Sequence, residues 1–287
     1  MSTRNAKRVK DITGMQQILI DLKPHRCDAD VYINQKMDVT KLMKYLKKRK
    51  EEGTHITFFH AIVAGIGKVL YNRNKLNRFV QDRHIIEHND VVISFVAKVT
   101  FDDHSDEMMI MVNIEPNDTI DTISKKIQGY VDKVRNSPKV EKEGANDAID
   151  IVGKFPNIIR IPIMGTLKWM DQKGILPSFL VKDNLYYSSI ILSNLGSIKC
   201  GAIHHNITNF GTCSSLATIG EIKDEIVLSE KGKEETKKLC EFGINLDERI
   251  ADGYYMAKSV KLLQYIFDNP ELLEQPANEI IDLGESR

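Results

Sequence analysis

The sequence predicts an α+β protein in which a sheet with long antiparallel stretches packs against a few long helices. Amphipathic helical segments, strand-like runs that cluster in the middle and in the last third, and the mixed order of the two together indicate this class. The 287 residues suit one large domain, with a polar leader over residues 1–12 and an acidic tail over residues 271–287.

The first half of the chain carries both strand and helix patterns. Residues 30–37 alternate like a strand, and Asp38 is placed to cap a helix that runs to Lys50. A second helix is expected over residues 57–72, because its apolar residues recur on one stripe. Strands are then expected at 83–87, 91–101 and 108–114, and a helix at 118–135.

The second half begins with a charged stretch, residues 136–146, which predicts a flexible connector. Residues 149–175 are apolar and partly helical although Pro156 and Pro162 interrupt them, so we expect a helical arm or lid over the core. Strand patterns return in the last third, and an amphipathic helix follows them. These elements are expected at 186–192, 214–222, 225–229, 235–246 and 253–268, with the residues after Pro270 loosely held.

Composition and charge argue against several classes of partner. The 40 basic and 40 acidic residues give no net charge, so no nucleic acid partner is expected. No apolar run reaches the roughly 18 residues of a membrane helix, and the polar start is not a secretory signal, so no membrane partner is expected. The 4 cysteines form no CxxC pair and the histidines share no ligand spacing. We therefore expect reduced thiols, no metal site and a cytoplasmic location.

Four short motifs follow one another between residues 13 and 273. The strongest is Asn-Leu-Asp-Glu-Arg-Ile-Ala-Asp-Gly at residues 245–253, directly before the last helix. The others are Ser-Asn-Leu-Gly at 193–196, Met-Asp-Val-Thr at 37–40 and Lys-Leu-Asn-Arg-Phe at 75–79. An ordered set of this kind is much more specific than any one tetrapeptide.

Together these motifs resemble those of the family of chloramphenicol acetyltransferases and of dihydrolipoyl acyltransferases, the 2-oxoacid dehydrogenase acyltransferases. The resemblance implies a two-layer sheet and helix sandwich that forms a homotrimer, with active sites at subunit interfaces. It also implies CoA or acyl-CoA as co-substrate and a small thiol, hydroxyl or amine as acyl acceptor. No lipoyl or subunit-binding domain is expected beside this domain.

The resemblance assigns roles to three residues. The family's motif histidine takes the proton of the acceptor, and Glu248 stands at its position. Ser193 matches the residue that donates to the oxyanion of the tetrahedral intermediate. Asp252 matches the motif aspartate, which in the family holds the loop, commonly through an arginine near the N-terminus.

That arginine is replaced as well. Gln16 stands at its position, which leaves Arg26 and Arg249 as candidate partners of Asp252, and the sequence does not fix which group pairs with it. An equally weighted interpretation is that Glu248 is structural and forms an ion pair with one of the same two arginines.

A glutamate changes the chemistry of the site. A free glutamate has a pKa near 4.3, against about 6.5 for histidine and about 8.5 for a thiol, so it is the weaker base by roughly 3 kcal/mol. Burial raises the pKa of a carboxyl and recovers part of this difference. Standard family chemistry through Glu248 is therefore handicapped.

A pair of histidines offers another base. His204 and His205 lie on the loop that follows the Ser193 motif, a stretch that borders the substrate channel in the family. One hypothesis is that one of them supplies the base or binds the acceptor. The alternative is that both are hydrogen-bonded loop residues or trimer contacts.

Two functions follow from the sequence. The first is CoA-dependent acyl transfer, with Ser193 at the oxyanion and Glu248 or a histidine of the pair as base. The second is a catalytically inactive trimer that keeps the fold as a binding or scaffold module.

Overall fold

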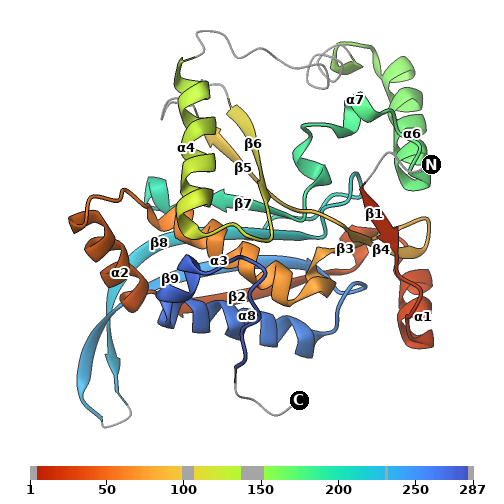
Figure 1. Ribbon diagram of the computed structural model, residues 1–287. Helices are drawn as coiled ribbons and strands as arrows, with labels where there is room; N and C mark the ends of the chain where they lie inside the picture. Colours follow the sequence, from red (N-terminus) through yellow and green to blue (C-terminus); the bar gives the residue numbers. More distant parts are fainter. Residues whose placement is uncertain (1–4, 99–106, 137–151, 230–231, 284–287) are drawn as a thin grey trace.

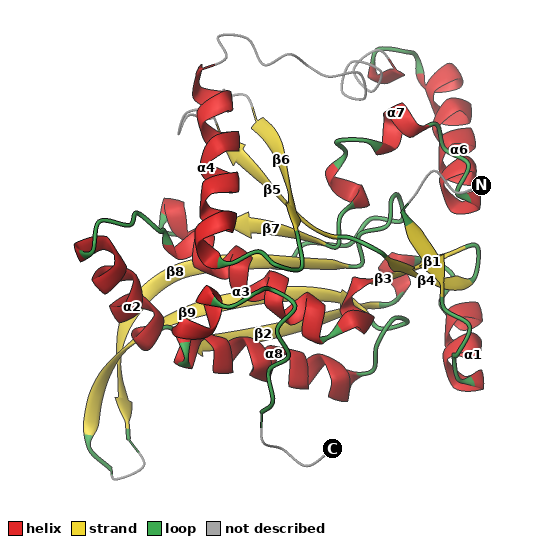
Figure 2. Ribbon diagram, in the orientation of Figure 1, coloured by secondary structure: helices red, strands yellow, loops and turns green. Residues whose placement is uncertain are grey.

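The computed structural model describes residues 5–98, 107–136, 152–229 and 232–283, and in it helices cover one face of a twisted sheet (Figures 1 and 2). The larger sheet has six strands in the order β2-β9-β8-β7-β5-β6. Adjacent strands are antiparallel except for the pairs β5 with β7 and β7 with β8, which are parallel. A smaller antiparallel sheet has the order β1-β4-β3. The predicted α+β class is confirmed.

The elements have the following bounds. The strands are β1 (Ala6–Arg8), β2 (Asp30–Asp38), β3 (Arg78–Gln81), β4 (His84–His88), β5 (Val91–Lys98), β6 (Glu107–Ile114), β7 (Ile190–Asn194), β8 (Ser215–Leu228) and β9 (Glu234–Asp247). The helices are α1 (Gly14–Leu22), α2 (Thr40–Glu51), α3 (Phe58–Asn72), α4 (Ile120–Asn136), α6 (Asn157–Lys173), α7 (Ser178–Val181) and α8 (Gly253–Asp268).

The core lies between the six-stranded sheet and the helices α2, α3, α4 and α8. Helix α3 is central to it, because its small residues let neighbours approach closely. A Cβ on Gly65 would lie 3.2 Å from Leu263 of α8, and one on Gly67 would lie 3.1 Å from Ile114 of β6. These two glycines, within one turn of α3, thus let the helix pack closely against both α8 and β6.

The N-terminal part of α3 buries a histidine. Thr57 caps the helix in a capping box with His60, and the Ser124 hydroxyl of α4 lies 2.8 Å from Nδ1 of the His60 ring. Burial lowers the pKa of His60 to about 4, and the nearby His55 adds to the effect. The imidazole is therefore neutral in the folded protein near neutral pH.

Some elements differ from the sequence-based expectation. The two strands expected over residues 214–229 are one strand, β8, whose outer half extends with β9 as a long hairpin beyond the helices. The polar leader contributes β1, which pairs with β4. The tail expected to be loose is held from residue 270 to 283, because Leu273 and Ala277 are buried in the core.

The apolar segment before β7 forms α6, and Pro156 stands at its N-cap. We expected a partly helical arm or lid over the core; the segment is helical, but α6 stands beside the smaller sheet, away from the helical layer (Figure 1). The connector predicted at 136–146 lies, after Asn136, outside the described residues. None of the helices in the described part of the chain has the length and apolarity that a bilayer crossing requires.

Candidate functional site

Ser193 lies on the face of the sheet that the helices leave open. Its neighbours along β7, β8 and β9 alternate, so Leu192, Ala217 and Phe242 point into the core while the residues between them point outward. The outward residues form one row across four strands. In register, this row is Ser193, Thr218, Gly243 and Asn34.

The loop over residues 200–207 lies on this outer face. Thr218 Oγ1 accepts a hydrogen bond from the Ile203 amide at 3.1 Å and donates to the Ile203 carbonyl. Gly243 makes the close approach possible, because a Cβ at this position would lie 2.4 Å from the Ile203 carbonyl oxygen. The loop is therefore bound to the sheet through its backbone.

The two histidines of this loop are held differently. His204 is half-buried, with Nε2 at 2.7 Å from Asn34 Oδ1 and Nδ1 at 3.2 Å from Asn245 Oδ1. The Tyr32 ring packs edge-on against the imidazole, with the ring centroids 5.3 Å apart. His205 is exposed.

Within one chain His204 is out of reach of Ser193. Its amide partners belong to β9 and β2, two and three strands away from β7, which corresponds to roughly 10–14 Å. A base must lie within about 3 Å of the proton it takes, or act through one water. A role of His204 or His205 next to Ser193 of the same chain is therefore disfavoured.

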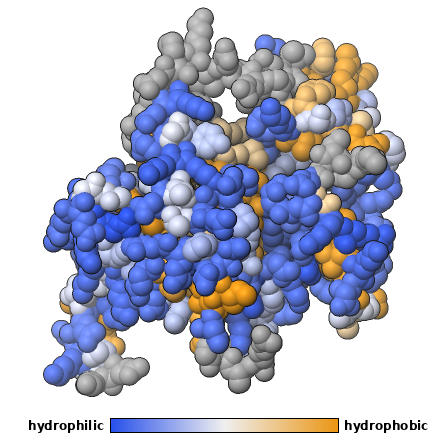
Figure 3. Space-filling model, in the orientation of Figure 1, coloured by the Kyte–Doolittle hydropathy of each residue, from blue (hydrophilic) through white to orange (hydrophobic). Residues whose placement is uncertain are grey.

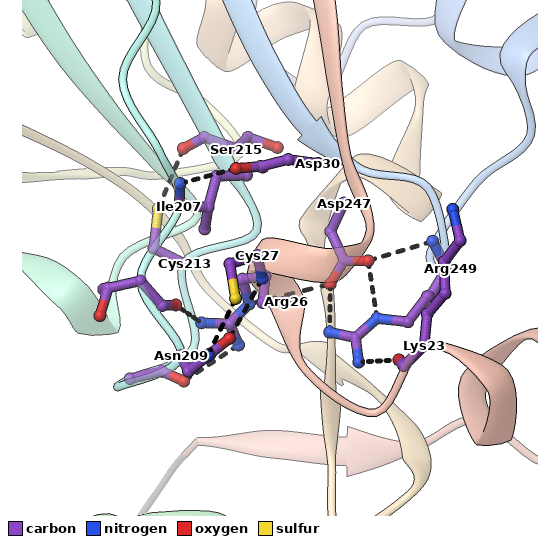
Figure 4. Close-up of polar contacts among 12 residues, drawn as sticks. Lys23, Arg26, Cys27, Asp30, Ile207, Asn209, Cys213, Ser215, Asp247 and Arg249 are labelled. Atoms are coloured by element: carbon purple, nitrogen blue, oxygen red, sulfur yellow. Dashed lines mark hydrogen bonds and ion pairs between the residues drawn. The ribbon is translucent and has the colours of Figure 1, made fainter.

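The residues on either side of Glu248 form a buried ion pair. Arg249 donates to both carboxylate oxygens of Asp247, from Nε at 2.8 Å and from NH2 at 2.7 Å (Figure 4). Arg26 lies on the other side of the same carboxylate, with Nε 3.8 Å from Asp247 Oδ2. All three side chains are at most 4% exposed.

Both arginines also bind backbone carbonyls of distant segments. Arg249 NH1 donates to Lys23 and Pro24 at 2.9 and 3.1 Å, whereas the Arg26 guanidinium donates to Thr208 and Gly211 at 2.8 and 3.1 Å. Burial lowers the pKa of Arg26, and the carboxylate of Asp247 opposes this shift. The cluster thus ties the N-terminal loop, the loop after His205 and the motif together.

Glu248 is not part of this buried cluster. Its carboxylate forms an ion pair with Lys23, and its amide donates to the Ala29 carbonyl at 3.0 Å. The side chains of Lys23 and Glu248 are 38% and 30% exposed. The expectation that Arg26 or Arg249 pairs with Glu248 is wrong, because Asp247 occupies both arginines.

Asp252 has a helix-capping position. Its Oδ1 accepts from the Tyr255 amide at 2.8 Å as the N-cap of α8. Neither of the two candidate arginines pairs with it, because Arg26 and Arg249 both pair with Asp247. Gln16 takes part in the capping box of α1 with Thr13 instead.

The two candidate catalytic side chains are far apart in one chain. Gly243 shares the row of Ser193 two strands away, and Glu248 follows Gly243 by five positions. At about 3.3 Å per residue and about 4.8 Å per strand, Ser193 and Glu248 are roughly 20 Å apart. Among the described residues, the Ser193 hydroxyl makes no hydrogen bond.

A cavity of about 230 Å³ lies beside the buried cluster, where Arg26, Asp171 and Arg249 line part of it. One of these lining residues, Asp171, accepts hydrogen bonds from the Tyr187 hydroxyl at 2.6 Å and from the Gly211 amide at 2.9 Å. Cys213 is close by, but burial raises the pKa of its thiol, which disfavours a nucleophilic role.

Sequence reasoning missed Asp247 and Lys23, and it named Arg26 without its actual partner, Asp247. The spacing of Asp247 and Arg249, two positions apart at the end of a strand, is a signal of a shared environment. Nothing local in the sequence places Arg26 or Lys23, because both come from the other end of the chain. In the described part of the chain, no group of three His, Cys, Asp or Glu residues is placed to hold a metal ion.

Comparison with known proteins identifies the fold. No family model and no curated protein matches the sequence. Among solved structures, a probable dihydrolipoamide acetyltransferase from Listeria monocytogenes is 15% identical with a TM-score of 0.60, covering 92% of this chain and 95% of that one. The cubic core of the pyruvate dehydrogenase multienzyme complex is 12% identical with a TM-score of 0.59, covering 92% and 93%.

A chloramphenicol acetyltransferase is 10% identical with a TM-score of 0.54, covering 91% of this chain and 99% of that one. At these identities the likeness concerns the fold alone, and it extends over almost the whole of each chain. The protein therefore has the acyltransferase-type fold that chloramphenicol acetyltransferase and dihydrolipoamide acetyltransferase cores share.

Proposed function

We propose that this protein transfers an acyl group from a CoA thioester to a small acceptor, at a site that two copies of the chain build together. The observation that carries the proposal is the separation of roughly 20 Å between Ser193 and Glu248 on one sheet. A head-to-tail ring, in which the Ser193 region of one copy meets the Glu248 region of the next, brings the two together. A homotrimer is the ring that the family resemblance implies.

Ser193 is suited to the oxyanion role. Its hydroxyl is half-buried on the outer face and has no hydrogen-bond partner among the described residues, so it is available to donate. A donor placed in advance where negative charge develops contributes several kcal/mol to an acyl transfer.

Glu248 is suited to taking a proton from an amine. A neutral amine nitrogen attacks the thioester carbonyl, and the C–N bond forms as negative charge moves to the oxygen that Ser193 stabilises. The nitrogen becomes cationic and acidic, so a carboxylate is a sufficient base for its proton. The C–S bond then breaks and CoA leaves as the thiol or thiolate. A thiol acceptor must instead be deprotonated before it attacks, for which glutamate is a weak base.

Lys23 acts as a positioning residue in this scheme. Its ammonium group pairs with the Glu248 carboxylate and holds it beside the N-terminal loop. Both side chains are partly exposed, so solvent and an incoming acceptor reach the carboxylate.

The direct test measures thioester consumption with acetyl-CoA and amine, hydroxyl and thiol acceptors. The proposal expects turnover that is fastest with an amine and that falls at least a hundredfold in Ser193→Ala and in Glu248→Gln. Mixing the two inactive variants under conditions that exchange subunits should restore about a quarter of the activity, since random exchange rebuilds that share of the sites. Loss in both variants without recovery on mixing would contradict the shared site.

A second candidate function is a catalytically inactive trimer that binds a ligand or a partner. The observation that favours it is that the polar side chains are already engaged: Glu248 with Lys23, and His204 with Asn34 and Asn245. A thermal-shift screen separates the two, because a ligand bound only by the native state raises its melting temperature. A shift with acetyl-CoA but no turnover supports the binding module, and absence of both contradicts acyl transfer.

A further inference from the structure

Helix α6 exposes an apolar stripe to solvent. Ile158, Ile161 and Trp169 follow one another at helical spacing on one face and are 84%, 66% and 54% exposed. Figure 3 shows apolar side chains gathered where α6 lies in Figure 1, with further apolar patches lower on the same side of a largely polar surface. The segment after the helix adds exposed Ile175 and Phe179. An apolar patch of this kind on a folded protein marks a contact surface.

The helix is fastened to the rest of the molecule at its C-terminal end. Asp171 is its only buried residue and binds Tyr187 and Gly211, while the Gln81 side chain donates to the Asp171 carbonyl at 2.8 Å. Lys173 adds an ion pair with Asp82. Among the described residues, the half of α6 that carries Ile158 and Ile161 is therefore exposed and open to a partner.

Within the described residues 152–173, every charged side chain that is not buried is basic. Lys154 and Lys168 are exposed and form no ion pair with a described residue, and the only acidic residue of α6 is the buried Asp171. Apolar side chains bordered by lysines are typical of helices that lie in the surface of a bilayer with anionic lipids.

We propose that α6 docks the protein on an anionic lipid bilayer surface, with Ile158, Ile161 and Trp169 in the interface and Lys154 and Lys168 at the headgroups. This is a surface attachment by a helix that lies on the bilayer, and it requires no spanning segment. It is independent of acyl transfer, because none of these residues belongs to the candidate site.

Trp169 provides a direct measurement, since it is the single tryptophan of the chain. Its fluorescence in the unmodified protein should shift to the blue when vesicles of phosphatidylglycerol and phosphatidylcholine are added. Raised salt should weaken the effect, and pure phosphatidylcholine vesicles should give much less. Absence of a shift with the anionic vesicles overturns the proposal.

Paired variants test the residues by vesicle sedimentation. Ile158→Ser with Ile161→Ser should lower the partition coefficient about tenfold or more, and Lys154→Gln and Lys168→Gln should each lower it about fivefold. The matched control is Ile226→Ser with Leu228→Ser in β8, where the side chains are 70% and 74% exposed, and it should bind as the unmodified protein does.

A second copy of the chain is the competing occupant of the stripe. In that case the tryptophan shifts to the blue with rising protein concentration in the absence of vesicles, and the α6 variants change the oligomeric mass in sedimentation velocity while vesicles bind nothing. That result overturns the lipid proposal whether or not the protein transfers acyl groups.

Discussion

Arg249 and Asp247 form a two-point ion pair at the end of β9, with both side chains buried and the guanidinium in contact with both carboxylate oxygens. Glu248 stands between them in the sequence and forms its ion pair with Lys23 instead. The pair therefore fixes the backbone from which the candidate catalytic carboxylate projects.

Removing one partner of this pair should be strongly destabilising. Arg249→Met leaves the carboxylate of Asp247 buried with only the more distant Arg26 beside it, which should lower the free energy of unfolding by about 3–5 kcal/mol. Urea denaturation followed by circular dichroism measures the change. Arg83→Gln breaks an exposed pair with Asp21 as a control and should cost less than about 1 kcal/mol. Equal losses of unfolding free energy in the two variants would contradict a stabilising role of the buried Arg249–Asp247 pair.

Gly243→Ala should separate the loop over residues 200–207 from the sheet. The new methyl group would lie 2.4 Å from the Ile203 carbonyl oxygen, a backbone atom that must move. We expect a loss of about 1–3 kcal/mol in unfolding free energy and faster hydrogen exchange at the Ile203 amide. Gly129→Ala in α4 is the control, because a Cβ there meets nothing within 4 Å. An unchanged exchange rate at Ile203 would argue against the contact.

Acidification should destabilise the protein through His60. Its folded-state pKa of about 4 is below the ordinary value of 6.5, so between these values the unfolded chain holds more protons than the folded one. Stability is then present above pH 6.5 and falls as the pH drops toward 4, by up to about 3 kcal/mol over that window. Denaturation as a function of pH should show a flatter profile in His60→Gln. The exposed His205→Gln should keep the original slope, and a flattening there instead would contradict the assignment.

Glu248→His should shift the acceptor preference. Histidine is the stronger base by about two pKa units, so transfer to a thiol acceptor should rise roughly tenfold while transfer to an amine changes little. Thioester consumption with the two acceptors measures the ratio. Glu248→Gln retains the size but not the basicity and should be slow with both. A ratio that is the same in all three proteins would show that Glu248 does not handle the proton.

The helices and strands that could be predicted from the sequence are those marked by local patterns, such as a capping residue or a regular spacing of apolar residues. Helix α8 has the bounds expected for it, because Asp252 caps it and its apolar residues repeat at helical spacing. Strand β8 was expected as two strands, over 214–222 and 225–229; the residues between them, 223 and 224, are charged and lie in the hairpin beyond the core, where neither face is buried. Helix α1 was not expected, although Met15, Ile18 and Leu22 recur at helical spacing; in the structure these three side chains are exposed and Ile20 is the buried residue of the helix.

The candidate site was predictable in identity but not in arrangement. The motifs gave Ser193, Glu248 and Asp252, whose spacing along the chain says nothing of their distance in space. The partners of the motif, Arg26 and Lys23, come from a loop at the other end of the sequence. Such pairs depend on tertiary packing, and a single sequence carries no periodicity that reports them.

The buried cluster of Arg26, Asp247 and Arg249 also determines when the newly made chain can complete its fold. Arg249 binds the carbonyl of Lys23 across 226 positions, and Arg26 binds that of Gly211 across 185. Contacts over such separations form slowly, since the loop between them must lose its entropy first. Strand β2 has β9 as its sole neighbour in the described sheet. The first long strand of this sequence is thus among the last to be placed, and among the described residues one of its edges stays unpaired even in the folded sheet.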